Sequence, residues 1–142
     1  MASQERYIKS SIYSKLSTDA TLVTLLGGTS NIFGSSPPKE VVYPCIVYEI
    51  VAVSDDPNSQ DTTGKMIETV FYINILSSNS KSEESDNIAD RVKTLLHGQR
   101  TLNTSSLICY SCYRQGRLRQ SRDPDTQILM TVESYRSLTA PK

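Results

Sequence analysis

Apolar residues recur at helical spacing near the start of the chain. The first predicted helix covers residues 4–16. Its apolar positions lie four residues apart on one stripe, at Ile8, Ile12 and Leu16. Residues 20–26 are rich in leucine and predict a second, short helix. Gly27 and Gly28 follow it directly, and glycine in this place is typical of a helix C-terminus. The chain therefore opens with two helices.

A third helix is predicted between Ser80 and Gly98. Ser80 and Glu83 have the spacing of a capping box, in which the two side chains satisfy backbone N–H groups at a helix start. The apolar positions share one face, at Ile88, Val92, Leu95 and Leu96. Acidic side chains fill the N-terminal half, where the helix dipole favours negative charge, at Glu83, Glu84, Asp86 and Asp90.

The remaining apolar residues follow the pattern of β-strands. A short extended piece is predicted at 31–33, and four longer strands at 45–53, 66–76, 106–114 and 126–136. The second of these alternates apolar and polar residues, as a strand with one buried face does. Each pair of long strands is separated by a polar stretch that is too long for a tight turn. Long flexible hairpin loops are therefore predicted at 54–65 and 115–125, and a disordered tail at 137–142.

The order of these elements predicts an α+β fold. We expect a single domain over residues 1–142, with a mostly antiparallel four-stranded sheet made of two long hairpins and helices packed on one face. No apolar run approaches the ~20 residues of a membrane helix, so no membrane partner is expected. The N-terminus lacks the apolar core of a signal peptide, and we expect synthesis and retention in a cytoplasm.

The charges balance over the chain but not along it. Lys and Arg number 15, as do Asp and Glu, which is unlike a general nucleic-acid binder. Residues 1–98 carry a net charge of −4 and residues 99–142 a net charge of +4. Such a chain suits pairing with copies of itself, although two solvated faces with no partner would give the same numbers.

Candidate chemistry is scarce, and no catalytic, cofactor-binding or metal-binding residue is predicted. The single histidine, His97, leaves no basis for a His-based triad or metal site. Cys109 and Cys112 have the C-x-x-C spacing of redox and zinc sites, but they fall in a predicted strand, where an odd offset points them to opposite faces. With Cys45 they are predicted to be buried structural thiols; a cytoplasmic thiol-dependent enzyme that uses Cys109 and Cys112 is the enzyme alternative.

Four arginines within nine residues form the sharpest cluster, at Arg114, Arg117, Arg119 and Arg122. They suit a phosphate, an acidic partner or no partner at all. The other predicted hairpin loop offers acidic complements at Asp55, Asp56 and Asp61, and the third helix offers four more. Contacts between different surfaces of neighbouring copies close into rings when the rotation allows. We therefore expect the four arginines, together with Asp55, Asp56 and Asp61, to lie at a subunit or partner interface.

Several segments together resemble a protein family. The run Leu16-Ser-Thr-Asp-Ala-Thr-Leu-Val-Thr-Leu-Leu-Gly-Gly28 is similar to the start of the small tail-completion proteins of long-tailed phages. Ile32-Phe33, Tyr43-Pro-Cys-Ile-Val-Tyr48 and Phe71-Tyr-Ile-Asn-Ile-Leu76 follow in the same order. The likeness covers about residues 5–137 and lies in the order of the elements more than in any one motif. Phe33 stands where tyrosine is usual in the family.

The resemblance implies a tail terminator, also called a tail-to-head joining protein. Such proteins assemble as hexameric rings that cap the head-proximal end of the tail tube, stop its polymerisation and provide the docking surface for the head connector. It further implies a virion protein of the tail or neck, assembled in the host cytoplasm, with no enzymatic activity and no cofactor. Its partners would be copies of itself, the tail tube protein and the connector or head-closure protein, with DNA passing through the ring without specific binding. Another neck component, a head-closure or connector protein, is the structural alternative.

Overall fold

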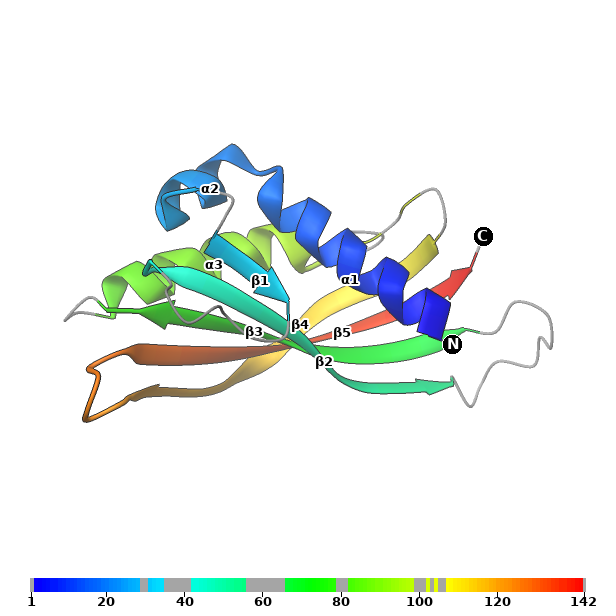
Figure 1. The fold of residues 1–142 in the computed structure, drawn as a ribbon. Helices are drawn as coiled ribbons and strands as arrows, with labels where there is room; N and C mark the ends of the chain where they lie inside the picture. The colour runs from blue at the N-terminus through cyan, green and yellow to red at the C-terminus, as the bar shows by residue number, and fades with distance from the viewer. Residues whose placement is uncertain are drawn as a thin grey trace.

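In the part of the chain that the structure describes, three helices and five strands follow one another (Figure 1). The computed structural model describes residues 2–28, 31–34, 42–55, 66–78, 82–98, 102, 104 and 107–141. The elements are α1 (Ala2–Ser17), α2 (Ala20–Leu26), β1 (Ile32–Gly34), β2 (Cys45–Asp55), β3 (Ile67–Ser77), α3 (Glu83–Leu96), β4 (Leu107–Arg122) and β5 (Leu129–Pro141). The three helices lie where apolar periodicity predicts them, which confirms that part of the sequence analysis.

The strands form one sheet in the order β1-β2-β3-β5-β4. Strands β2 and β3 pair antiparallel, as do β4 and β5, and β3 joins the two hairpins by pairing antiparallel with β5. The α+β class and the two hairpins are thus confirmed, but the sheet has a fifth strand. Strand β1 pairs parallel to β2 over only three residues, from Ile32 opposite Ile46 to Gly34 opposite Tyr48. Three residues are too few to show a strand period, so the sequence predicted only an extended piece.

All three helices lie on one face of the sheet, as predicted (Figure 1). Their apolar stripes are buried to 1% exposure or less and include Ile8, Ile12, Leu16, Leu22, Leu26, Ile88, Val92 and Leu96. Strand β3 alternates buried and half-buried residues along its whole length, with Phe71, Ile73 and Ile75 facing the helices. Among the helices that the structure describes, none combines the length and the apolar character needed to cross a bilayer.

A charged link joins the start of α2 to α3. Asp19 is the N-cap of α2 and accepts a hydrogen bond from the backbone N–H of Leu22 at 2.8 Å. The same carboxylate accepts from Arg91 Nε at 2.8 Å and from Arg91 Nη2 at 2.6 Å. The hydrogen bonds from Arg91 hold the pKa of Asp19 at about 2, below its ordinary value of 3.8. At the other end of α2, Gly27 adopts φ +79°, the left-handed conformation that favours glycine.

The second hairpin is longer than the sequence predicts. Residues 115–122, predicted as loop, belong to β4, and residues 137–141, predicted as disordered, belong to β5. Only a short turn at 123–128 separates the two strands. The polar composition of 115–122 was misleading because its side chains find partners on β5 and α3, far away in the sequence. Of the other predicted loop, 54–65, Ser54 and Asp55 end β2, and 56–65 lie outside the described residues.

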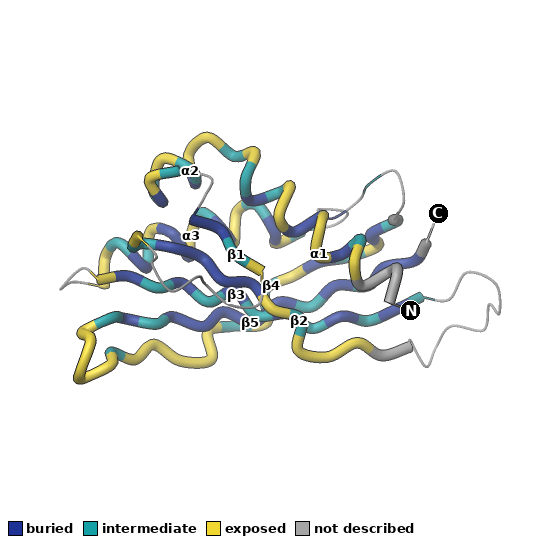
Figure 2. The backbone as a smooth tube through the Cα atoms, in the orientation of Figure 1, coloured by how far each residue is buried: buried dark blue, intermediate teal, exposed yellow. Residues whose placement is uncertain are grey.

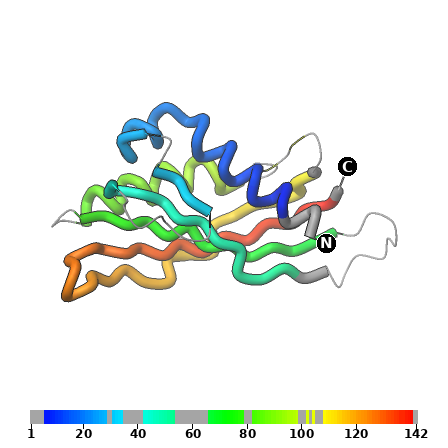
Figure 3. Tube along the Cα trace, in the orientation of Figure 1, coloured from blue at the N-terminus to red at the C-terminus, as the bar shows by residue number. Residues whose placement is uncertain are grey.

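The two hairpins reach toward opposite ends of the molecule. Figure 3 shows the turn between β4 and β5 at one end, and the far halves of β2 and β3 at the other.

Candidate functional site

Strand β4 lies at the edge of the sheet, and its pairing with β5 is interrupted three times. The register shifts leave one extra residue on β4 each time, at Tyr110, Gln115 and Leu118. Bulges of this kind change which face the following side chains point to, and they are common on edge strands. The faces of the arginines on β4 therefore follow from the bulges and not from simple alternation.

A buried carboxylate holds two of the four predicted arginines. Glu133 on β5 is 1% exposed and faces the helices. Its Oε1 accepts a hydrogen bond from Arg114 Nε at 2.7 Å, and its Oε2 accepts one from Arg117 Nε at 2.8 Å. The two guanidinium groups stay partly in solvent, with 26% and 32% of their side chains exposed. The pairing meets the rule that a buried charge needs a partner of opposite charge.

The same network ties the hairpin to the start of α3. Arg117 Nη1 donates to Asp86 Oδ1 at 3.1 Å, and Gln120 Nε2 lies 3.3 Å from the same oxygen. Gln120 Nε2 also donates to Thr131 Oγ1 at 3.0 Å. Asp86 was predicted as one of the acidic complements that a neighbouring copy would meet. In the structure it meets Arg117 of its own chain.

The other two predicted arginines have different roles. Arg122 Nη1 donates to the carbonyl oxygen of Gln127 at 2.8 Å, which braces the turn between the strands. Arg119 pairs with Val132 in the sheet and points to the face without helices. It is exposed and forms no hydrogen bond or ion pair with any residue that the structure describes. Of the four arginines, Arg119 is thus the one most available to a partner.

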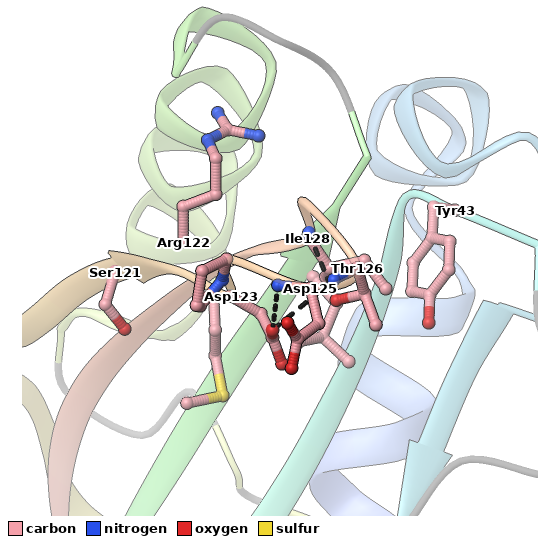
Figure 4. Close-up of a pocket in the computed structure, with 10 residues that line it drawn as sticks. Tyr43, Ser121, Arg122, Asp123, Asp125, Thr126 and Ile128 are labelled. Carbon is pink, nitrogen blue, oxygen red and sulfur yellow. Dashed lines mark hydrogen bonds between the residues drawn. The ribbon is translucent and has the colours of Figure 1, made fainter.

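A hollow of about 610 Å³ lies beside this turn. Its lining consists of Tyr43, Leu76, Ser121, Arg122, Asp123, Pro124, Asp125, Thr126, Ile128 and Met130. Figure 4 shows the carboxylates of Asp123 and Asp125 near each other, the Tyr43 ring on the opposite side, and the Arg122 guanidinium pointing away. Asp123 Oδ1 accepts from the backbone N–H of Asp125 at 2.8 Å and so stabilises the turn itself. The hollow therefore offers a shape with an acidic rim at Asp123 and Asp125.

The thiols are placed for packing. Cys45, Cys109 and Cys112, all in the described part of the chain, are buried to 1% exposure or less and form no disulfide. The prediction that Cys109 and Cys112 point to opposite faces is wrong. The extra residue Tyr110 between them shifts the register, so both lie opposite buried residues of β5, Thr139 and Ser137. Burial raises the pKa of the Cys45 thiol to about 11.

The structure brings together only part of the predicted interface. Asp56 and Asp61 lie outside the described residues, and Asp55 is described only as the last residue of β2. Sequence reasoning missed Glu133, the residue that organises Arg114 and Arg117. A signal existed in Thr131, Glu133 and Tyr135, which occupy alternate positions of the predicted strand 126–136 and therefore share one face. In the described ranges, no three His, Cys, Asp or Glu side chains are placed to hold a metal ion.

Comparison with known proteins identifies a family and solved structures of similar fold. The family model described as "Tail completion protein gp17" matches residues 10–135. No curated protein matches the sequence. A chain in the solved structure titled "Virion of native gene transfer agent (GTA) particle" is similar in fold, with a TM-score of 0.71 and 16% sequence identity. The match covers 91% of this chain and 91% of that one, so the likeness extends over nearly the whole fold.

Proposed function

Because this chain belongs to the family of tail completion proteins, a family of structural phage virion proteins, we propose that it is a tail terminator. In this role it forms a ring that caps the head-proximal end of the tail tube, stops its polymerisation and provides the docking surface for the head connector. The observation that carries the proposal is the family match over residues 10–135, which spans every element from α2 to β4 and parts of α1 and β5. The hexameric state is part of the proposal.

The related fold supports a place in a virion. A protein of similar fold occurs in the virion of a gene transfer agent particle. We propose that this chain likewise resides in the tail or neck of the particle after assembly in the host cytoplasm. Its partners are then copies of itself, the tail tube protein and the connector or head-closure protein.

The side-chain arrangement supports a role without chemistry. A thiol nucleophile must be reachable and partly ionised, and Cys109 and Cys112 are both almost completely buried. The enzyme alternative therefore has little support. The ion pairs also bear on DNA passage, because Arg114 and Arg117 are neutralised by Glu133 and Asp86 of the same chain. Paired arginines bind phosphate less strongly, which suits a ring through which DNA must slide.

The test is a phage in which the gene for this chain is disrupted, compared with the same phage complemented by the wild-type gene. If the chain is a tail terminator, the disrupted phage should make tail tubes of uncontrolled length without heads. Complementation should restore tails of uniform length. Electron microscopy of tails incubated with the purified chain should then show a ring at one end only. Tails of normal length that fail to join heads would instead identify a head-closure or connector protein. Normal, infectious particles without the chain would refute a role in tail completion.

A further inference from the structure

Among the described residues, two stretches of sheet edge have no neighbouring strand, and they lie on opposite sides of the sheet. On one side, the described residues give β4 a second partner only at the bridge between Gly98 and Cys112 and at the hydrogen bond from the Arg114 N–H to His97 Nδ1 at 2.9 Å. On the other side, β1 ends beside Tyr48, and no described strand accompanies β2 beyond it. Most residues in both stretches, 115–121 of β4 and 49–53 of β2, are exposed (Figure 2).

Apolar side chains stand exposed on these open edges. Leu118 on β4 is 53% exposed, and Val51 and Val53 on β2 are 47% and 39% exposed. An open edge that carries exposed apolar residues is a site for pairing with another strand. The bulges at Gln115, Leu118 and near Val51 make each edge irregular, so that an arbitrary strand fits poorly and a matching edge is needed.

The two edges also carry opposite charges on the same face. Arg119 lies on the helix-free face at the β4 edge and has no described partner. Glu49 lies on that face at the β2 edge, and its hydrogen bond with a described residue is neutral, accepted from Asn74 Nδ2 at 3.1 Å. Residues that pair directly with one another across the four long strands form a row. The row that begins at Glu49 on β2 ends at Gly116 on β4, and the next row on the same face ends at Arg119. The two charges are thus only one row out of line, about 7 Å along the strands.

Strand directions permit the two edges to join. Three successive antiparallel pairings separate β2 from β4, so these two strands run in opposite directions within one chain. A second copy in the same orientation therefore presents its β2 edge antiparallel to the β4 edge of the first. An offset of one row between neighbouring sheets is compatible with closure, because strands in closed barrels tilt and stagger in the same way.

We propose that copies of this chain join head to tail through these edges, with 115–119 of β4 adding antiparallel to 49–53 of β2 in the next copy. Residues 120–122 of β4 then diverge from that copy, because its β1 occupies the β2 edge at 46–48. Arg119 of one copy then lies opposite Glu49 of its neighbour, on the same face of a continuous sheet. The two surfaces differ, so the contact is heterologous and repeats around a ring. This inference rests on the proposed ring and names the surface that builds it.

Charge reversal tests the contact. Arg119→Glu gives both edges of a copy negative charge, and Glu49→Lys gives both edges positive charge, so each variant alone places like charges together. We expect each alone to cap isolated tails about tenfold less than the wild type, with a loss that shrinks at high salt. An equal mixture alternates the two variants, and every contact then becomes complementary again. Capping by the mixture should return close to the wild-type level.

Matched controls reverse exposed charges on α3, with Lys93→Glu and Asp90→Lys. We expect these variants, alone or mixed, to behave as the wild type does. Thermal melts of every variant establish that the monomer is folded. Arg119→Glu or Glu49→Lys that caps tails normally, or folded variants whose mixture is no better than either alone, would overturn the inference. Wild-type chain that never caps tails would instead overturn the proposed function, so the two failures are distinct.

Cross-linking provides a second measurement. Directly opposed residues in antiparallel strands have Cα atoms ~4.5–5.5 Å apart, within the range of a disulfide. A variant with both Arg119→Cys and Glu49→Cys should form covalent chains of copies when oxidised on tails, whereas each single substitution should not. If tails are capped by the double-cysteine variant but no linked copies form, the pairing of Arg119 with Glu49 is refuted.

Discussion

Replacing Glu133 by glutamine tests whether the β4–β5 hairpin depends on one buried charge. The carboxylate is 1% exposed and accepts hydrogen bonds from Arg114 and Arg117 at 2.7 and 2.8 Å. Hydrogen bonds to charged groups contribute about 1.5–3 kcal/mol each. Glutamine can accept one of the two, and its NH2 group then faces the other guanidinium. Because 26% and 32% of the two arginine side chains are exposed, water offsets part of the loss. We expect Glu133→Gln to lower the free energy of unfolding by about 2–3 kcal/mol.

Urea unfolding followed by circular dichroism measures this difference. Against a total stability of ~5–15 kcal/mol, the loss is large enough to shift the midpoint clearly. Glu49→Gln is the matched control, since it makes the same chemical change at an exposed carboxylate and should alter stability by less than ~0.5 kcal/mol. A double-mutant cycle with Arg114→Met separates the pair from general effects of burial. A loss below 0.5 kcal/mol for Glu133→Gln would refute the assignment of Glu133 as the organising charge.

Three further predictions concern the core and the helix link. Asp19 has a pKa of about 2, below its ordinary value, so its ion pair with Arg91 stabilises the fold fully above pH 3.8 and is lost as pH falls through 2. Asp19→Asn keeps the helix cap, and the free energy of unfolding should then lose about 1 kcal/mol less on acidification than in the wild type. Equal pH profiles of unfolding for the variant and the wild type would contradict the pairing. Tyr135 is fully buried and its hydroxyl has no partner among the described residues, so Tyr135→Phe should leave the melting temperature unchanged or raise it, whereas a clear fall would reveal a missed partner. Alkylation of Cys45 at pH 8, followed by mass spectrometry, should be more than about a hundredfold slower in the folded than in the unfolded chain, and comparable rates would contradict its burial.

The bulges on β4 explain one wrong prediction and one separation of side chains that regular alternation would not give. A strand with regular alternation would separate Cys109 and Cys112 onto different faces, and the extra residue Tyr110 brings them onto one. Likewise, the extra residue Leu118 lies between Arg117, which faces Glu133, and Arg119, which faces solvent on the other side of the sheet. Nothing in the local sequence marks these insertions, because a bulge is defined by pairing with a partner strand.

The sequence alone determined the parts of this protein that depend on neighbours along the chain. Apolar spacing located α1, α2 and α3, glycine placed the end of α2, and apolar stretches, alternating in β3, identified the strands of both hairpins. The order of these segments was also sufficient for the family resemblance, because it survives when individual residues change.

Only the tertiary structure decided how the charges are used. The partners of Glu133 lie 19 and 16 residues away, at Arg114 and Arg117, and Arg91 lies 72 residues from Asp19. Such pairings arise because strands and helices packed in space bring together side chains whose separation in the sequence carries no period. The same holds for the three-residue strand β1 and for the open edges of β2 and β4, since an edge exists only relative to the sheet that it borders. Local patterns therefore predict which elements form, and packing decides which of their side chains remain available to another copy of the chain.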